Sequence, residues 1–331
     1  MHRSDRIRIF CTELWSWFEK NKRTLPWRDI TEKNLDHKAY LILVSEVMLQ
    51  QTQVSRVIIL YKNFIQQFPY IEALSKASNR EILIAWRGLG YNNRAIRLRD
   101  AAKTIVDKYH GKFPREMTEL QELPGVGHYT AGAIRNFAFG IPTPCMDVNI
   151  RRILHRFFVG PENADGTWKK NDAYLLELSQ EILTEALRTG STQNWHAALM
   201  DFGSLICTKN NPQWQMMSKK MESVCMAYGK RMVRTPVPDC SKQSVRGAAK
   251  KVNKEPGRMM AGKFIPNRIF RGRIIETLRD ARNQLTLEEL GSQAIGDWTL
   301  EDNREWLEAL LKKLQSDGLI EKKRGKYLLH G

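Results

Sequence analysis

Apolar residues recur at helical spacing in one segment after another between Arg6 and about Tyr228. No run in this part of the chain alternates between apolar and polar residues as a half-buried strand would. The spacing therefore predicts an all-α structure. The 331 residues, 42% of them hydrophobic, suffice for a sizeable core and for more than one domain. The clearest expected helices lie within residues 7–21, 40–68, 79–86, 94–109 and 130–139.

The composition changes abruptly at the end of this helical part. Residues 230–274 contain 13 Lys or Arg but only 2 Asp or Glu, together with Pro236, Pro238 and Pro256. A stretch of this kind does not form a packed core. It is either a solvated linker or a segment that contacts phosphates directly, and both can hold together. We predict a first domain over residues 1–229 and a basic flexible linker over residues 230–263.

The remaining residues, 264–331, have the pattern of a small α+β domain. Helical spacing is expected over 268–281, 286–293 and 300–317, and residues 318–329 have the pattern of a short hairpin with a basic tip. Three helices and such a hairpin predict a winged-helix-like domain. Winged helices often bind DNA, with one helix in the major groove and the wing on the backbone. Many winged helices bind proteins instead, so the possibility that this domain recruits a protein partner also stays open.

The charge and the cysteines indicate the partner and the compartment. A formal net charge of +17 and a pI near 9.7 favour a polyanionic partner. Nucleic acid is favoured over a membrane, because no long apolar span or signal peptide is present. The odd number of scattered cysteines suits a reducing cytosol better than it suits a disulfide framework. We expect a cytoplasmic protein, associated with the nucleoid if its source is a prokaryote. The cysteines are Cys11, Cys145, Cys207, Cys225 and Cys240.

The segment 123–133, LPGVGHYTAGA, has the pattern of two helices joined by a Gly-x-Gly turn. Gly125 and Gly127 can adopt positive φ and bring bare backbone close to a partner. The helix that begins near Thr130 points free N–H groups toward an anion, for which phosphate is the natural candidate. A simple Pro-Gly connector before a helix would look the same. The candidate DNA contacts here are Gly125, Val126, Gly127, His128 and Thr130.

Glu46 is a carboxyl within an otherwise apolar expected helix, flanked by Leu43, Val44, Val47 and Met48. Burial raises the pKa of a carboxyl and keeps a proton available near neutrality, as a general acid requires. Alternatively, Glu46 lies on a solvated helix face or pairs with an arginine.

Asp147 follows the hairpin segment and precedes an expected helix that begins near Val148. If it stays ionised, its carboxylate can stabilise positive charge that develops on a sugar as a base departs. Two carboxylates in different environments would then share the cleavage of a glycosidic bond: one donates a proton to the leaving group, and the other stabilises the positive charge on the sugar. Asp147 can equally be the N-cap of the helix, and one residue can do both.

Six motifs together resemble the helix-hairpin-helix DNA glycosylases, and the set is most similar to the MutY-type adenine DNA glycosylases. The resemblance covers about residues 6–228 and implies an all-α helix-hairpin-helix glycosylase core, to which the winged-helix domain is added. The motifs are LPWR at 25–28, 45–54, GLGY at 88–91 followed by Arg94-Ala95, 123–134, DVN at 147–149, and MDFG at 200–203.

The resemblance implies a role for each matching residue. Glu46 matches the acid that protonates the adenine leaving group, and Asp147 matches the carboxylate that stabilises the oxocarbenium-like intermediate. Tyr129 and Asn149 match residues that assist at the same catalytic site. The implied base pocket contains Trp27, Arg28, Leu49 and Asp201, and it would hold a flipped base. The implied contacts with DNA outside the hairpin are Gln50, Gln51 and Tyr91.

Tyr129 also bears on the type of reaction. A lysine at this position in the related endonuclease III branch forms a Schiff base and adds strand cleavage, which a tyrosine cannot do. We therefore expect a monofunctional enzyme without lyase activity, removing adenine opposite 8-oxoguanine or guanine in base excision repair. Thymine or uracil glycosylases at G·T or G·U mismatches remain an alternative, although Gln50-Gln51-Thr52 favours adenine. A second alternative is a DNA-binding protein whose catalysis has lapsed.

Three departures from the family pattern change what is expected. The family commonly holds a 4Fe-4S cluster at Cys-x6-Cys-x2-Cys-x5-Cys, but here only Cys207 matches, because the next positions are Trp214, Met217 and Ser223. We predict no cluster, no other metal and no cofactor. The double tyrosine after Gly-Leu-Gly is Tyr91-Asn92 here, and the tail does not resemble the Nudix-like domain that reads 8-oxoguanine. We expect a monomer that binds double-stranded DNA containing a mismatch or an oxidised base. We expect no binding to a membrane.

Overall fold

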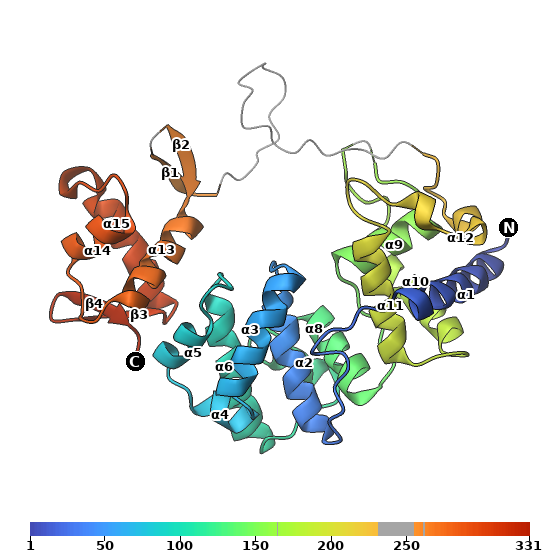
Figure 1. Ribbon diagram of the computed structural model, residues 1–331, viewed down its shortest axis with the longest axis horizontal. Helices are drawn as coiled ribbons and strands as arrows, with labels where there is room; N and C mark the ends of the chain where they lie inside the picture. Colours follow the sequence, from blue (N-terminus) through green and yellow to red (C-terminus); the bar gives the residue numbers. More distant parts are fainter. Residues whose placement is uncertain (164, 231–254, 261) are drawn as a thin grey trace. The chain divides into compact units, whose positions relative to one another are not determined.

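The computed structural model describes residues 1–163, 165–230, 255–260 and 262–331 (Figure 1). Within residues 1–163 and 165–230 the regular structure is helical throughout, which confirms the all-α prediction. The α-helices here are α1 (Arg3–Asn21), α2 (Leu35–Leu49), α3 (Val54–Gln67), α4 (Ile71–Lys76), α5 (Asn79–Ala85), α6 (Asn93–Tyr109), α7 (Met117–Glu122), α8 (His128–Ile134), α9 (Val148–Phe158), α10 (Asp172–Ala186), α11 (Thr192–Leu205) and α12 (Lys219–Val224). A π-helical turn, η1 (Arg135–Phe139), continues α8, and a 3-10 turn, η2 (Trp214–Met216), precedes α12.

The described residues divide into two compact units. One contains residues 1–42 and 115–121 and the chain from 126 up to the linker, and the other contains 43–114, 122–125 and the C-terminal part. In the first unit α1 packs against α10, α11 and α12, and α9 packs against α11. Its core is rich in aromatic residues, such as Phe10 and Phe157, whose ring centroids lie 4.8 Å apart. Burial of such side chains is the main stabilising contribution to this unit.

In the second unit α4 and α5 pack against α6. Ser78 and Glu81 form a capping box that fixes the start of α5. The buried rings of Phe64 and Trp86 meet edge to face, 5.8 Å apart. The long apolar pattern over residues 40–68 proves to be two helices, α2 and α3, which are separated at Gln51, where φ is +56°.

The C-terminal part has the predicted winged-helix character, with the α+β class confirmed. It contains α13 (Asn267–Asp280), α14 (Leu287–Ala294) and α15 (Leu300–Ser316), followed by an antiparallel hairpin of β3 (Ile320–Lys323) and β4 (Lys326–Leu329). Leu285 adds a bridge to Tyr327. Trp306 packs edge to face on the buried Phe270, with ring centroids 4.8 Å apart.

A second hairpin, which the sequence pattern did not reveal, precedes α13. Strands β1 (Gly257–Met260) and β2 (Lys263–Pro266) pair in antiparallel register. Their residues fall partly in the predicted linker. The sequence pattern did not reveal them, because the high density of positive charge masks a short apolar pattern around the turn at Gly262. Residues 231–254 of that linker lie outside the described residues. Among the helices that the structure describes, none is long and apolar enough to cross a membrane.

Candidate active site

The predicted hairpin is formed by α7 and α8, with the turn at residues 123–127. Gly125 has φ of +78°, and a Cβ at this position would lie 3.0 Å from Cβ of Arg97, so both conformation and space require glycine. Gly127 does not adopt the positive φ that we expected. Its φ is −90°, and it is the N-cap of α8, which begins at His128 rather than near Thr130.

The hairpin exposes its backbone and buries part of its side chains. Gly125, Gly127 and His128 are exposed, whereas Val126 and Thr130 are 5% and 3% exposed. Any contact of these two buried residues with a phosphate therefore has to come from the backbone. This agrees with an anion site made of N–H groups.

Behind the hairpin, Asn136 organises the chain that leads to Asp147. Its buried amide nitrogen donates to the carbonyls of Gly132 and Thr143, at 2.8 Å each, and its oxygen accepts from the Thr143 amide. A Cβ on Gly132 would lie 2.5 Å from Cβ of Cys145, so glycine allows the returning chain to cross α8 closely. The position of Asp147 is therefore set by contacts in the buried core.

Asp147 is the N-cap of α9, as one of the two interpretations of the sequence predicted. Its Oδ1 accepts hydrogen bonds from the backbone amides of Asn149 (2.9 Å) and Ile150 (2.7 Å). Its Oδ2 accepts one from the side-chain amide of Asn149, at 2.8 Å. Three donors therefore fix the orientation of the carboxylate, and the positive end of the helix dipole favours its charge. Asp147 and Asn149 are half-buried, and Val148 between them is 69% exposed, so solvent reaches this cap.

Asn149 is itself held by Arg152. The guanidinium of Arg152 donates to Oδ1 of Asn149 at 2.6 Å and to the carbonyl of Gly203 at 2.7 Å. A Cβ on Gly203 would lie 2.7 Å from Cβ of Asn149, so this glycine lets α11 approach α9 closely. Burial lowers the pKa of Arg152. A series of hydrogen bonds, from Arg152 to Asn149 and from Asn149 to Asp147, thus connects the core with the solvent-facing carboxylate.

The predicted pocket residues Arg28 and Asp201 form a buried ion pair. Oδ2 of Asp201, which is completely buried, accepts from Arg28 at 2.6 Å and from the backbone amide of Arg23 at 3.1 Å. The Arg23 guanidinium contacts the other oxygen. Both carboxylate oxygens are therefore engaged by Arg28 and Arg23.

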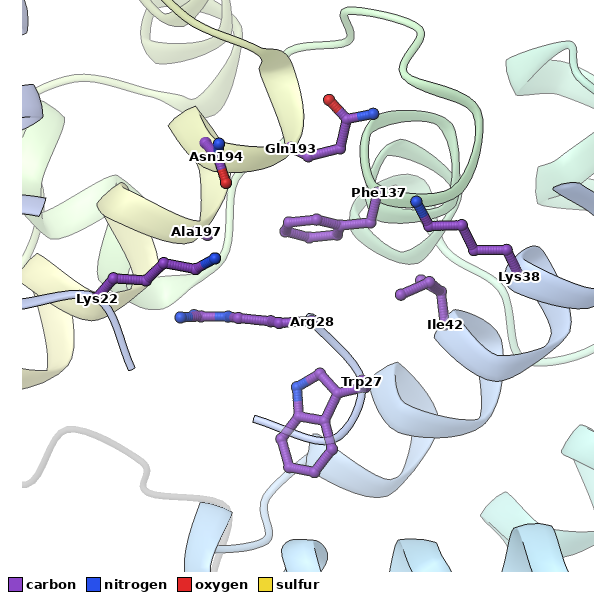
Figure 2. Close-up of a pocket in the computed structure, with 9 residues that line it drawn as sticks. All are labelled: Lys22, Trp27, Arg28, Lys38, Ile42, Phe137, Gln193, Asn194 and Ala197. Carbon is purple, nitrogen blue, oxygen red and sulfur yellow. The ribbon is translucent and has the colours of Figure 1, made fainter. Parts of the chain in front are cut away.

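Trp27 and Arg28 line a pocket of about 60 Å³ in the first unit. Figure 2 shows the Arg28 side chain extended between the ring of Phe137 and Trp27. The volume suits a few water molecules and lies well below the roughly 300 Å³ at which small-molecule sites begin. Asp201, which belongs to the same unit, does not line it. The other lining residues are Lys22, Lys38, Ile42, Gln193, Asn194 and Ala197.

Glu46 lies in α2 and is 5% exposed, among the buried side chains of Leu43, Val44, Val47 and Met48. This excludes the interpretation in which Glu46 lies on a solvated helix face. A carboxyl in such surroundings is shielded from bulk water, as the general-acid hypothesis requires.

Arg94 joins the two loops that carry the remaining expected DNA contacts. Its guanidinium donates to the carbonyls of Val47 (2.8 Å) and Met48 (3.1 Å) at the end of α2, and it also reaches the Gln50 carbonyl. From the other side it donates to the carbonyls of Leu89 (2.9 Å) and Gly90 (3.2 Å). Burial lowers the pKa of Arg94 to about 10, which leaves it charged at neutral pH.

The two loops joined in this way present Gln51 and Tyr91. Both residues are exposed and have positive φ, +56° and +46°, a conformation that costs non-glycine residues free energy. Gln50 is exposed as well, and Leu49, the last residue of α2, is half-buried. Two exposed side chains on strained, tightly held loops are suited to entering a partner without rearrangement.

Tyr129 lies in the first turn of α8 and is half-buried. Its hydroxyl is 4.0 Å from the sulfur of Met200, the residue before Asp201. Tyr129, Asp147 and Asn149 belong to the first unit, and Glu46, Gln51 and Tyr91 belong to the second.

The residues at the expected cluster positions do not fit an iron–sulfur cluster. Cys207 is buried, and burial raises the pKa of its thiol; burial also raises the pKa of Cys225 to about 12. The buried guanidinium of Arg156 lies 3.8 Å from the Cys207 sulfur and donates to the carbonyl of Thr208 at 2.7 Å. A cluster needs several thiolate ligands, and Trp214, Met217 and Ser223 at the other expected positions cannot supply them. The described residues contain no group of three or more His, Cys, Asp or Glu placed to hold a metal.

Apolar side chains fill the loop before α12 only in part. Met217 is 8% exposed and Trp214 is half-buried, whereas Met216 is 57% exposed.

Sequence reasoning missed Arg94, Asn136 and Arg152, which position the candidate residues. The available signal was a charged or amide side chain within an apolar helical pattern. The residues that such a side chain contacts, however, lie up to about 60 positions away in the chain.

Comparisons with known proteins show similarity to DNA repair glycosylases. The family model "HhH-GPD superfamily base excision DNA repair protein" matches residues 44–181. An adenine DNA glycosylase of Mus musculus is 40% identical over 225 residues, which cover 67% of this chain but only 42% of the mouse protein. An adenine DNA glycosylase of Mycolicibacterium smegmatis is 32% identical over 320 residues, which cover 96% of this chain and 95% of that protein. Among solved structures, a thermostable thymine-DNA glycosylase aligns with a TM-score of 0.59 and 26% identity, covering 69% of this chain and 99% of that one.

Proposed function

Because the chain belongs to the adenine DNA glycosylases of the HhH-GPD superfamily, we propose that it hydrolyses the N-glycosidic bond of mispaired adenine in double-stranded DNA. The base opposite the adenine is 8-oxoguanine or guanine in this proposal. The reaction is the first step of base excision repair.

The observation that carries the proposal is the Asp147 carboxylate, fixed by three donors at a solvent-facing helix end. A negative charge held in one place stabilises the positive charge that develops on the deoxyribose as the base departs. Asn149 orients this carboxylate, and Tyr129 assists at the same sugar. Glu46 supplies the proton to the departing adenine, because its buried environment separates it from bulk water.

The reaction ends with the addition of water to the sugar. Tyr129 has no amine with which to form a Schiff base, so the strand stays intact at the abasic site. The flipped adenine is held by Trp27, Arg28 and Leu49, with Asp201 fixing Arg28. Gln50, Gln51 and Tyr91 enter or line the duplex, and the hairpin turn holds a phosphate.

We also propose that the protein works as a monomer in the cytosol without an iron–sulfur cluster. The support for the last point is the donor set around Cys207, in which the expected thiolate positions are Trp214, Met217 and Ser223.

A second candidate substrate is thymine or uracil opposite guanine. The similarity to a thymine-DNA glycosylase at 26% identity favours it. Against it stand the two adenine glycosylases of higher identity.

The substitution Glu46→Gln tests the proposal, because it preserves side-chain volume and removes the acidic proton. We expect release of adenine to slow by roughly 100-fold or more, with binding to the mismatched duplex retained. Glu19→Gln, at an exposed position of α1, is the matched control and should release adenine at the wild-type rate. An unchanged rate in Glu46→Gln would overturn the role assigned to Glu46.

A further inference from the structure

The second unit contains a groove of about 930 Å³ along α6 and the C-terminal domain. One side is formed by the loops that carry Gln51 and Tyr91, together with α6. The other side is formed by α13 and by the inner face of α15, which contributes Trp306 and Lys313.

Polar contacts hold the two sides of this groove together. The Arg279 guanidinium donates to the side chain of Asn92 at 2.8 Å, next to Tyr91. The side-chain amide of Asn79 donates to the carbonyl of Gly318 at 2.6 Å, and Arg87 pairs with Glu276 at 3.1 Å. The groove is therefore a defined site rather than a gap between tethered parts.

The lining of the groove is strongly basic. Among the described residues that line it are six cationic side chains and a single carboxylate, Glu255, although Asp317 pairs with Arg271 and, at 3.0 Å, with Lys313. Arg97 is exposed, and the side chain of Arg268 is 54% exposed although it pairs with Glu255. Two aromatic side chains, Tyr91 and Trp306, lie among these charges. Basic grooves with interleaved aromatic rings fit nucleic-acid strands. The cationic residues are Arg56, Arg94, Arg97, Arg268, Arg271 and Lys313.

The groove is continuous with the hairpin turn. Arg97 lies directly against Gly125, since a Cβ on that glycine would be 3.0 Å from Cβ of Arg97. A phosphate backbone that contacts the turn can therefore run on past Arg97 toward α13.

The helix that a winged-helix domain usually places in the major groove of DNA has the wrong charge here. The outward-facing charged residues of α15 are mostly acidic, and their carboxylates would repel phosphates. Arg304 on this face is already engaged with Glu308, at 3.2 Å. Helix α13, by contrast, presents two arginines to the groove, Arg268, which pairs with Glu255, and Arg271, which pairs with Asp317. The acidic residues of the outer face of α15 are Glu301, Asp302, Glu305 and Glu308.

We propose that this groove binds the sugar–phosphate backbone of the DNA next to the point where Gln51 and Tyr91 enter the duplex, with α13 rather than α15 as the DNA-facing helix of the winged-helix domain. The proposal rests on the proposed function for the identity of the nucleic acid, because it assumes that the duplex is the substrate. In this proposal the C-terminal domain increases the affinity for DNA, and the outer face of α15 does not contact DNA.

The test compares two double variants of the full chain that remove the same charge. Arg97→Gln with Arg268→Gln removes two groove cations, and Arg304→Gln with Lys312→Gln removes two cations from the outer face of α15. Binding to a mismatched duplex is measured by fluorescence anisotropy over a range of salt concentrations, and circular dichroism checks that both variants are folded.

We expect the groove variant to bind roughly tenfold or more weakly, and the slope of log Kd against log salt to fall by about 1.8, since each phosphate contact contributes about 0.9. The α15 variant should retain wild-type affinity, slope and base release. Unchanged affinity and slope in the groove variant would overturn the proposal, and so would an equal or larger loss in the α15 variant. The single charge reversal Arg268→Glu is a second, independent test of the groove and should weaken binding to the mismatched duplex as well.

Failure of the groove proposal and failure of the proposed function give different results. If the wild type releases adenine and the groove variant binds normally, only the groove proposal fails. If the wild type releases no base but the groove variant loses affinity, the groove binds DNA and the enzymatic proposal fails.

Discussion

The side-chain amide of Asn149 donates a 2.8 Å hydrogen bond to Oδ2 of Asp147, while the backbone amide of the same residue donates to Oδ1. One residue thus holds both oxygens of the carboxylate. Because Arg152 in turn holds Asn149 at 2.6 Å, rotation of the carboxylate would break contacts that reach into the core. The Asp147 cap therefore combines a structural role with the geometry of a catalytic group.

These two roles can be separated by two substitutions at Asp147. Asparagine caps a helix about as well as aspartate but has no charge, and its amide nitrogen cannot accept the hydrogen bond from the Asn149 side chain. Asp147→Asn should therefore lose less stability than Asp147→Ala but lose base release by 100-fold or more, roughly the loss seen when an electrostatic stabiliser is removed. Asp147→Ala should lose base release and also about 1 kcal/mol of stability. Urea unfolding and single-turnover base release measure both. Retained base release in Asp147→Asn would contradict the electrostatic role.

Arg94→Lys should loosen both DNA-facing loops. A lysine ammonium has three donors and cannot replace a planar guanidinium that reaches carbonyls on two sides. We expect a loss of roughly 2 kcal/mol or more in unfolding free energy and weaker binding to duplex DNA. The exposed Arg80 on α5 provides the control, because Arg80→Lys should change neither quantity. If Arg94→Lys has wild-type stability and affinity, the role assigned to Arg94 is wrong.

Gly125→Ala should strain the hairpin turn. Its φ of +78° costs an alanine roughly 1–2 kcal/mol, and the new Cβ would press on Arg97. Thermal unfolding should therefore show a lower Tm, and duplex binding should weaken with it. Gly127→Ser is the matched control for the Tm alone, because φ of −90° and the N-cap position suit serine. Equal effects of the two substitutions would refute this distinction between the glycines.

The protein should contain no iron–sulfur cluster. Anaerobically purified protein is expected to lack near-visible iron absorbance and to contain no stoichiometric iron, since only Cys207 occupies an expected ligand position and its thiol is buried. Incubation with iron and sulfide under reducing conditions should leave its Tm unchanged. A brown protein with four iron atoms per chain would show that the donor set has been misjudged.

Local patterns in the sequence predicted the helices, the winged-helix tail and the N-cap at Asp147 well. These features depend on neighbouring residues, such as an apolar spacing or an aspartate before Val148. The same reasoning was wrong about the φ of Gly127, because a Gly-x-Gly turn needs only one glycine in the left-handed region.

Contacts between distant parts of the chain could not be predicted in this way. The ion pair between Arg28 and Asp201 spans 173 positions of the sequence. Because of this pairing, Asp201, expected in the base pocket, is a buried residue that holds Arg28 in place. The contacts of Arg94 with the end of α2 span 46 and 47 positions. No spacing rule contains such pairs, since they arise only when helices pack.

The most direct test of the central claim is single-turnover base release from three duplexes, with adenine opposite 8-oxoguanine, adenine opposite guanine and thymine opposite guanine. Alkali is added afterward to cleave abasic sites. We predict strand cleavage at adenine in the first two duplexes, only after alkali, and none at thymine. Release of thymine alone, or binding to all three duplexes without release of any base, would contradict the assignment as an adenine glycosylase.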